Sequence, residues 1–244
     1  MKIVFSRKGF DSTAGGGPSP ILGGRPVSLP IPDTKGISRT TYGDLGLGDH
    51  AARASRGRYG AGSLCHHDPL FTEDGRCVLG QVHSAQSHLA KQQVGIGDVL
   101  LFFGLFAGEG EAAHHRIFGY MWIEEIVPLA DAGEETRARF LALDHPHALG
   151  MHGKNDTLYV GAGERARTAS SALRLTVPEG PVTMWHRPSW LRRGEITYFP
   201  DKDANWPEGR LYRVGNGQEF VADAGEREEP REWLAQVIEA IRAE

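Results

Sequence analysis

Short apolar runs separated by glycine and proline dominate the pattern along the chain. Because these runs are rich in β-branched and aromatic residues, they predict strands, several of them buried. The predicted strands cover residues 2–5, 25–32, 99–106, 116–129, 157–163, 172–177, 195–200 and 218–223. Two other segments repeat apolar residues every three or four positions and predict amphipathic helices over 81–93 and 230–244. The pattern therefore predicts a strand-rich α+β fold, with a mixed or antiparallel sheet or a partly open barrel and few helices.

Length and composition exclude several classes of protein. The chain has 244 residues, is 40% hydrophobic and 24% charged, and carries a net charge of −4, values typical of globular proteins rather than disordered or fibrous ones. No apolar stretch is long enough to cross a membrane, and the first residues do not form a signal peptide. Cys65 and Cys77 predict two free thiols in a reducing, cytoplasmic location. We expect a single domain over 1–244 without a membrane partner; the sequence leaves the oligomeric state open.

Basic side chains gather near the start of the chain. Residues 1–60 are net basic, whereas the remainder is acidic. Within this part, the segment 6–20 follows the first predicted strand and combines Arg7 and Lys8 with glycines that expose backbone N–H groups. Such a loop can hold a phosphate or a carboxylate, although it is neither a P-loop nor a dinucleotide-binding motif, and a tight structural turn is the alternative. The candidate binding residues here are Ser6, Arg7, Lys8, Gly9, Gly16, Gly17 and Ser19.

The segment 64–71 places two histidines, a cysteine and an aspartate at adjacent positions. His67 and Asp68 are candidates for an acid and a base, or for a substrate contact. Adjacent residues point in different directions, whereas zinc ligands are usually spaced further apart. A structural turn is therefore the main alternative, and we predict no metal site here.

A second histidine pair, His145 and His147, has the spacing that places both side chains on one face of a strand. A metal ion at this pair would need further ligands from elsewhere, such as His152 or His186. This interpretation is the less favoured one, and the sequence again predicts no metal site.

The predicted helix over 81–93 carries a polar stripe made of Gln81, Ser84 and His88. This stripe can line a pocket, and a solvated helix surface is the alternative. The helix, the turn that follows it and the two next strands resemble the arrangement in PUA-like β-barrels, including EVE and ASCH modules. Those modules recognise RNA or modified bases, so the resemblance implies a barrel pocket for a base.

Six motifs taken in order carry a broader resemblance: SRKGFDSTAGGGPSPIL, CHHDP, GQVHSAQSHLAKQQVGIGDVLLFFGLF, RIFGYMWIEEI, HPH and GNGQEFVAD. Together they resemble the family called nucleotide modification associated domain 3, found in bacteria and phages. The resemblance implies a single domain and a link with nucleotide or DNA modification, without a demonstrated reaction. It extends over the whole chain except residues 43–64, which match nothing in that pattern. The matching positions are Ser6, Arg7, Lys8, Gly9, Asp11, Gly16, Pro18, Ser19, His67, Asp68, Gln81, His88, His145, His147, Gln218, Glu219 and Phe220.

Two functions follow as alternatives. The first is an enzyme that alters a nucleotide or a nucleic-acid base, which it would bind through the basic loop, Gln81 and Gln218. Its candidate acids and bases are Asp11, His67, Asp68, His88 and Glu219. The second is a non-catalytic reader that stacks a modified base on aromatic rings, for which Trp185, Trp190 and Trp206 are candidates, although an aromatic core is their more usual role. No nicotinamide, flavin or methyl-donor motif is present, so the cofactor remains unassigned.

Overall fold

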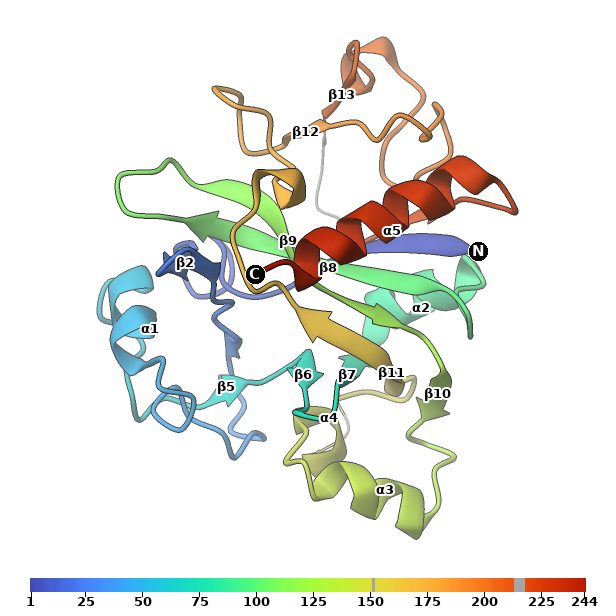
Figure 1. The fold of residues 1–244 in the computed structure, drawn as a ribbon. Coiled ribbons are helices and arrows are strands. Elements are labelled where there is room, and N and C mark those ends of the chain that lie inside the picture. Colours follow the sequence, from blue (N-terminus) through green and yellow to red (C-terminus); the bar gives the residue numbers. More distant parts are fainter. Residues whose placement is uncertain (151, 213–217) are drawn as a thin grey trace.

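A curled mixed sheet forms the centre of the fold (Figure 1). The computed structural model describes residues 1–150, 152–212 and 218–244. Along the sheet the order is β14 (Glu219–Asp223), β1 (Lys2–Arg7), β8 (Val99–Ala107), β9 (His114–Trp122), β11 (Thr157–Arg165), β7 (Arg76–Gln81) and β6 (Leu70–Phe71). β1 pairs with β8 in parallel and with β14 antiparallel, and the other neighbours are antiparallel. The sheet bends into a half-barrel, which confirms the predicted α+β class.

Short strands and helices surround this sheet. β2 (Ser19–Leu22) pairs with β3 (Arg25–Pro26) and β8, and β10 (Glu125–Pro128) pairs with β11. Two small ladders join β4 (Ile31–Pro32) with β5 (Cys65–His66) and β12 (Met184–His186) with β13 (Arg210–Tyr212). The helices are α1 (Gly48–Ala54), α2 (His83–Lys91), α3 (Glu134–Leu141), α4 (Pro146–Leu149) and α5 (Glu228–Arg242), with short 3₁₀ turns at Ser171–Leu173 and Asp203–Asn205. None of the described helices is long and apolar enough to cross a membrane.

The two faces of the sheet bury different layers. Successive residues of a strand point to opposite faces, so Ile3 and Phe5 pack under α5 while Val4 packs with Leu89 of α2 on the other side. Figure 1 shows α5 lying across the strands. Because both faces are covered, the inner strands read as continuous apolar runs in the sequence, and this made β1 and β8 predictable.

The three tryptophans considered for base stacking belong to the core under α5. Trp185, Trp190 and Trp206 are 1%, 5% and 7% exposed and pack among apolar side chains of the central strands and α5. The core interpretation of these rings is therefore confirmed, and they do not form an aromatic cage for a ligand.

The predicted strands over 172–177 and 195–200 do not form ladders. The first contains the end of a 3₁₀ turn and isolated bridges, and the second contains one isolated bridge, between Ile196 and Ala222. Their alternating apolar side chains are nevertheless buried against the sheet, as Leu173 and Leu175 show. Burial on a sheet face thus produced the alternation that a paired strand would also give.

Three short helices escaped prediction. α1 lies within the irregular segment 43–64, and α3 and α4 follow β10. The single strand predicted over 116–129 is divided into β9 and β10. The bulge expected at Gly119 is present, because the register between β8 and β9 shifts beside its partner Phe102.

Candidate functional site

One cleft of about 330 Å³ collects side chains from segments that are far apart in the sequence. It lies where β1 and β7 end and where α2 begins, and we call it the central cleft. The predicted site residues that line it are Arg7, Lys8, Gly9, Asp11, Asp68, Gln81 and Gln218. Other polar groups also line the cleft. They include His66 and His147, and the first turn of α2 with Ser84 and Ala85. The first loop, the CHHDP motif and the GQEF motif therefore converge.

Backbone pairing explains why these segments meet. Arg7 ends β1 and donates its N–H to the Gln218 carbonyl at 2.7 Å, while the Lys8 N–H bonds to the Phe103 carbonyl at 2.8 Å. On the other side, β7 ends at Gln81, two residues before α2 begins, so Gln81 lies on a strand and not on the helix predicted over 81–93. Two strand ends of one sheet thus place their last side chains at a common opening.

Within the basic loop, the Asp11 carboxylate accepts backbone N–H groups that could otherwise donate to a bound anion. Asp11 accepts the backbone N–H groups of Thr13 and Ala14, both at 2.7 Å, and its other oxygen pairs with Arg7. Although burial opposes ionisation, these hydrogen bonds and the Arg7 charge lower the pKa of Asp11. Asp11 is therefore an ionised organiser of the loop rather than a proton donor.

The later glycines of this loop lie outside the central cleft. Gly16 and Gly17 line a different pocket beside α1, and the Gly16 N–H donates to the Asp11 carbonyl at 2.8 Å. A Cβ at Gly17 would lie 2.5 Å from the Ala54 carbonyl oxygen, so this glycine permits a close approach of the loop to α1. Ser19 is buried and accepts the Leu29 N–H at 3.0 Å. These contacts account structurally for all three residues.

Glu219 forms a buried polar network directly behind the central cleft. Its Oε1 accepts hydrogen bonds from Ser6 Oγ at 3.0 Å, Lys8 Nζ at 3.0 Å and Gln81 Nε2 at 2.5 Å. Its Oε2 is buried without a hydrogen-bond partner. Burial raises the pKa of Glu219, and the nearby Lys8 ammonium opposes part of this effect. A carboxyl group with a raised pKa and a free oxygen is a candidate proton donor or acceptor.

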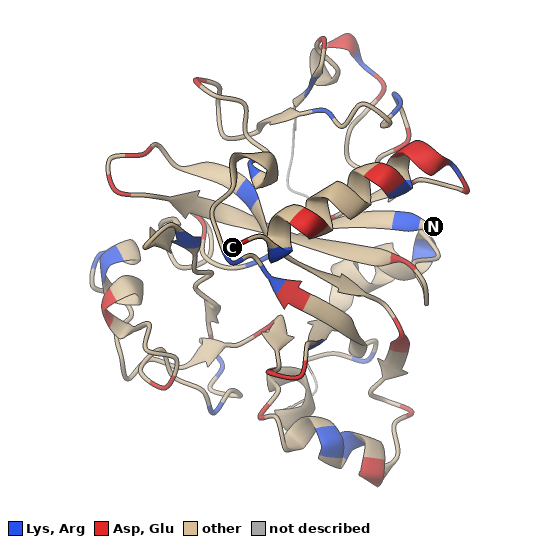
Figure 2. Cartoon of the chain, in the orientation of Figure 1, with Lys and Arg blue, Asp and Glu red and all other residues tan. Residues whose placement is uncertain are grey.

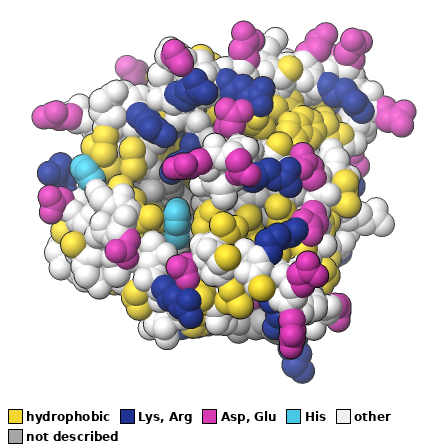
Figure 3. Space-filling model, turned by 60° about the horizontal axis from the view of Figure 1, so that its bottom comes forward, with side chains coloured by type: hydrophobic (Ala, Val, Ile, Leu, Met, Phe, Trp, Pro, Cys, Tyr) yellow, Lys and Arg dark blue, Asp and Glu magenta, His cyan; other side chains and the backbone are white. Residues whose placement is uncertain are grey.

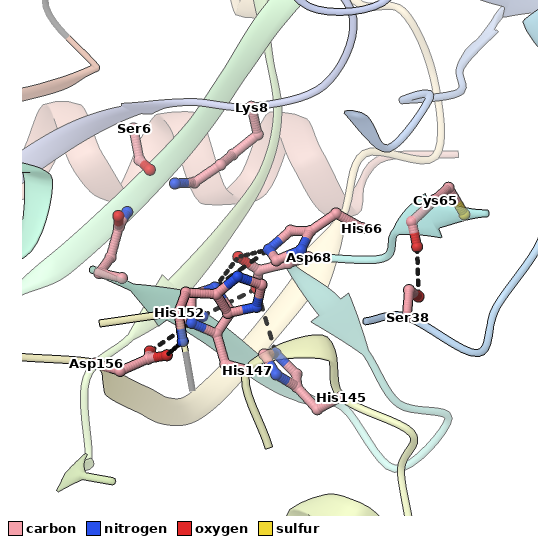
Figure 4. A network of polar contacts seen from close by, with 12 residues as sticks. Ser6, Lys8, Ser38, Cys65, His66, Asp68, His145, His147, His152 and Asp156 are labelled. Atoms are coloured by element: carbon pink, nitrogen blue, oxygen red, sulfur yellow. Dashed lines mark hydrogen bonds and ion pairs between the residues drawn. The ribbon is translucent and has the colours of Figure 1, made fainter. Parts of the chain in front are cut away.

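Three imidazoles meet on the side of the central cleft opposite β1 (Figure 4). His66 from β5, His147 from α4 and His152 each offer one ring nitrogen, and these atoms lie within 4.8 Å of one another. The Nε2 atoms of His66 and His147 are 3.2 Å apart. Figure 4 shows Ser6 and Lys8 pointing from the β1 side towards this cluster. Among the described residues, this histidine cluster is the group whose donor atoms can hold a metal ion.

Asp68 lies beside the histidine cluster and is nearly fully buried. Its Oδ1 accepts the Gly80 N–H at 3.0 Å and lies 3.3 Å from His145 Nε2, and its Oδ2 is 3.9 Å from His66 Nε2 and 4.0 Å from His147 Nε2. Burial opposes its ionisation, but contact with His145 and the charges of the neighbouring imidazoles hold the pKa of Asp68 well below its usual value. Asp68 is therefore an ionised acceptor.

Two histidines predicted as acid–base candidates lie elsewhere. His67 lines a second cavity of about 390 Å³ with Arg165, and burial together with the Arg165 charge lowers the pKa of His67 to about 4. His88 lies 3.2 Å from Thr197 Oγ1 and packs against the Tyr198 ring. Of the five predicted acids and bases, Asp11 and Asp68 line the central cleft, Glu219 lies behind it, and His67 and His88 do not reach it.

His66 was missed in the sequence although a signal was present. On extended chain His66 and Asp68, two positions apart, share a side, whereas His67 points away. His152 and His186 were named as further ligands that a metal at His145 and His147 would need. His152 lies in the histidine cluster beside His147, whereas His186 is exposed on β12. His145 contacts Asp68 instead. Alternation along the CHHDP motif would therefore have selected His66 over His67.

Charges of both signs are spread over the molecule. Lys and Arg are interspersed with Asp and Glu along the ribbon (Figure 2), and the face in Figure 3 shows the same mixture around apolar patches. Any attraction of a phosphate must therefore arise locally, as at the central cleft.

Comparison with known proteins places the chain in a family. Neither a curated protein nor a solved structure matches it. The likeness to PUA-like barrels accordingly stays a prediction. In contrast, the family described as nucleotide modification associated domain 3 matches residues 2–223, with its first loop, cleft histidines and Glu219 all inside that range. The chain therefore belongs to the nucleotide modification associated domain 3 family.

Proposed function

We propose that the protein is an enzyme that binds a nucleotide, or a nucleotide within a nucleic acid, in the central cleft and modifies its base. The family name associates the chain with nucleotide modification. The observation that carries the proposal is the convergence of Arg7, Lys8, Gln81, Asp68 and Gln218 around one opening. Hydrogen-bonding, cationic and acidic side chains gathered in one cleft are typical of a catalytic site.

The phosphate would lie between the end of β1 and the start of α2. The first four N–H groups of a helix lack partners within the helix, and Ser84 and Ala85 of this turn line the cleft. The first N–H group of α2, that of His83, donates to Asn155 Oδ1 at 2.9 Å. Arg7 and Lys8 face the same space, where Arg7 also contacts Asp11 and Lys8 also contacts Glu219. Helix dipole and cations together favour an anion here.

Glu219 is the proposed acid–base group. It lies behind Lys8 and Gln81, with one oxygen free of hydrogen bonds, and burial raises its pKa. A buried carboxyl group with a raised pKa is a candidate general acid or base. Gln81 and Gln218 can each donate and accept hydrogen bonds, as recognition of a base edge requires.

The lining of the central cleft does not favour the reader function. Among the described residues that line it, the rings are imidazoles, with no Phe, Tyr or Trp. A reader that encloses a base relies on such rings for stacking. The carboxylates of Asp11 and Asp68 line the cleft instead, and carboxylates are among the groups that serve as general acids and bases.

Calorimetric titration of the purified full chain with mononucleotides, and with plain and modified DNA and RNA oligonucleotides, tests the binding step. We expect Arg7→Ala and Gln81→Ala to weaken nucleotide binding by about 10-fold or more, the loss of roughly one charge-assisted hydrogen bond. The matched control is Lys202→Ala, an exposed cation outside the cleft. No binding, or an equal loss in the control, would overturn the proposal.

Mass spectrometry of the incubated nucleotide separates the enzyme from the reader. We expect a mass change with the wild-type chain, and about 100-fold slower change with Glu219→Gln, as loss of a general acid or base usually causes. Nucleotide binding by Glu219→Gln should persist. If the bound nucleotide keeps its mass under every condition that supports binding, the reader function replaces the proposed one.

A further inference from the structure

We propose that the histidine cluster, made of His66, His147 and His152, binds a divalent transition-metal ion of the zinc type at the edge of the central cleft. Nothing in the family description assigns a metal to this chain. The proposal rests on the geometry of these side chains and not on nucleotide binding. It therefore stands or falls independently of the proposed function.

The spacing of the ring nitrogens fits a zinc ion. Zinc–nitrogen bonds of about 2.0–2.1 Å in tetrahedral geometry place two ligand nitrogens about 3.3 Å apart. The Nε2 atoms of His66 and His147 are 3.2 Å apart, and the donor atom of His152 completes a triangle with sides of at most 4.8 Å. Three histidines with one remaining position is the ligand set of several catalytic zinc sites.

An outer carboxylate orients the His147 ring as metal ligands are usually oriented. Asp156 Oδ1 lies 2.5 Å from His147 Nδ1, and its Oδ2 accepts the backbone N–H of His152 at 2.8 Å. In the tautomer that carries its proton on Nδ1, His147 donates to Asp156 and keeps a lone pair on Nε2 for a metal ion. Carboxylate partners of this kind accompany many metal-binding histidines.

A purely structural cluster does not account for the remaining nitrogen. If His66 and His147 simply shared a hydrogen bond through their Nε2 atoms, His152 Nε2 would still be buried without a partner, as it is in this structure. Leaving a buried polar atom unsatisfied costs about 1–3 kcal/mol. A metal ion would satisfy this nitrogen and the facing nitrogens of His66 and His147 at once.

Asp68 is placed to respond to the ion. Its Oδ2 lies 3.9 and 4.0 Å from the Nε2 atoms of His66 and His147, so its carboxylate charge would lie beside the ion. Since His66 and His147 line the central cleft, the ion would be open to a ligand bound there. A divalent ion at such a position polarises a substrate oxygen or activates a water molecule.

The test is calorimetric titration of the full chain, first treated with a chelator, with zinc chloride alone. We expect one zinc ion per chain for the wild type, and an affinity about 100-fold lower in His66→Ala, His147→Ala and His152→Ala, since each removes one of three protein ligands. The matched control is His186→Ala, an exposed histidine on β12. Cobalt substitution adds an absorption spectrum that reports tetrahedral nitrogen coordination.

Folding of each variant is checked by circular dichroism and by thermal unfolding with and without zinc. Zinc should raise the melting temperature of the wild type and of His186→Ala, because a ligand that binds only the folded state stabilises it. It should not raise that of the three cluster variants. The proposal would be overturned if the folded wild type bound no zinc. It would also be overturned if the three cluster variants kept the wild-type zinc affinity, or if His186→Ala lost as much zinc affinity as they do. Zinc binding by a chain that binds no nucleotide would remove the proposed function alone.

Discussion

Two groups of buried histidines differ in how their ring nitrogens are satisfied. On β9, His114 Nδ1 lies 3.1 Å from the Ala112 carbonyl and its Nε2 accepts from Arg116 Nε at 3.2 Å. His115 Nδ1 accepts from Trp185 Nε1 at 3.0 Å. In the histidine cluster, by contrast, His152 Nε2 is buried without a partner. Both groups come from short histidine-rich motifs and both are largely buried. Burial alone does not separate the two groups, whereas the buried ring nitrogen of His152 that lacks a hydrogen-bond partner does.

The largest expected effect concerns the β9 group. Trp185 is 1% exposed, holds His115 through its indole N–H and packs against Phe5 and Phe103. Trp185→Ala should lower the free energy of unfolding by about 3–5 kcal/mol, because the core loses a large ring and gains a cavity. Urea denaturation measures this change.

The affinity for zinc should be unchanged in the folded fraction of Trp185→Ala. Ile96→Ala is the matched control, because Ile96 is 72% exposed and its truncation should change stability by less than about 0.5 kcal/mol. A loss of zinc affinity in Trp185→Ala would mean that the two histidine groups are coupled, and the comparison would fail.

The second prediction concerns a substitution that displaces a ring of the histidine cluster without removing any of the three histidines. A Cβ at Gly80 would lie 2.1 Å from Cδ2 of the His147 ring, so the ring must move. Gly80→Ala should weaken zinc binding by about 10-fold or more, since a displaced ligand loses its geometry. Overpacking should also cost about 1–3 kcal/mol of stability.

Gly95→Ala provides the comparison for this change. Gly95 has open space around its missing Cβ, so alanine there should leave zinc affinity intact. Calorimetry on both variants gives the answer. Equal affinities in Gly80→Ala and Gly95→Ala would show that His147 does not ligate the ion.

A third, smaller effect concerns the orientation of His147. Asp156→Asn replaces the carboxylate that fixes the ring proton. Zinc affinity should fall by about 10-fold, at the low end of what outer hydrogen bonds to metal ligands contribute. Asp131→Asn, an exposed site, is the control, and calorimetry with zinc alone is again the measurement. Unchanged affinity in Asp156→Asn would indicate that His147 is held by packing alone.

The sequence revealed the strands better than the site. β1, β8 and β14 were predictable because strands covered on both faces leave continuous apolar runs. The loops around the site carry no such period, and which loop meets which depends on the pairing of strands distant in sequence. Arg7 and Gln218 were both named, yet only the pairing of β1 with β14 shows that they are neighbours.

Within motifs, the sequence lacked the local backbone direction. Adjacent residues of the CHHDP motif were expected to point in different directions, but the sequence did not show which direction faces the site, and His67 was chosen over His66. The glycines after Asp11 suggested a receptor for an anion, but the nearest anion proved to be Asp11 itself, which occupies the N–H groups of Thr13 and Ala14. A loop whose N–H groups bind an internal carboxylate and a loop whose N–H groups bind an external anion can have the same pattern of glycines and basic residues, so the sequence does not distinguish them.

The contrast between satisfied and unsatisfied groups extends from histidines to carboxyl groups, and Glu219 gives the smallest expected effect. Because burial raises the pKa of Glu219 despite its one charged contact, Lys8, the folded chain holds the proton more tightly than the unfolded chain. This stabilisation is fully present below the ordinary pKa of 4.5 and is lost as pH rises to the raised pKa of the folded chain. The loss amounts to about 1.4 kcal/mol for each pH unit that separates the two pKa values. The glutamine of Glu219→Gln does not titrate. The free energy of unfolding of Glu219→Gln should therefore rise relative to that of the wild type as the pH increases from 4.5 to the raised pKa of Glu219.

Urea denaturation from pH 4 to neutral pH measures the difference between Glu219→Gln and wild type. Glu208→Gln, an exposed control, should run parallel to wild type over the same range. A Glu219→Gln curve that also ran parallel would mean that Lys8 and Gln81 fully compensate the buried charge, and that Glu219 is as satisfied as the histidines of β9.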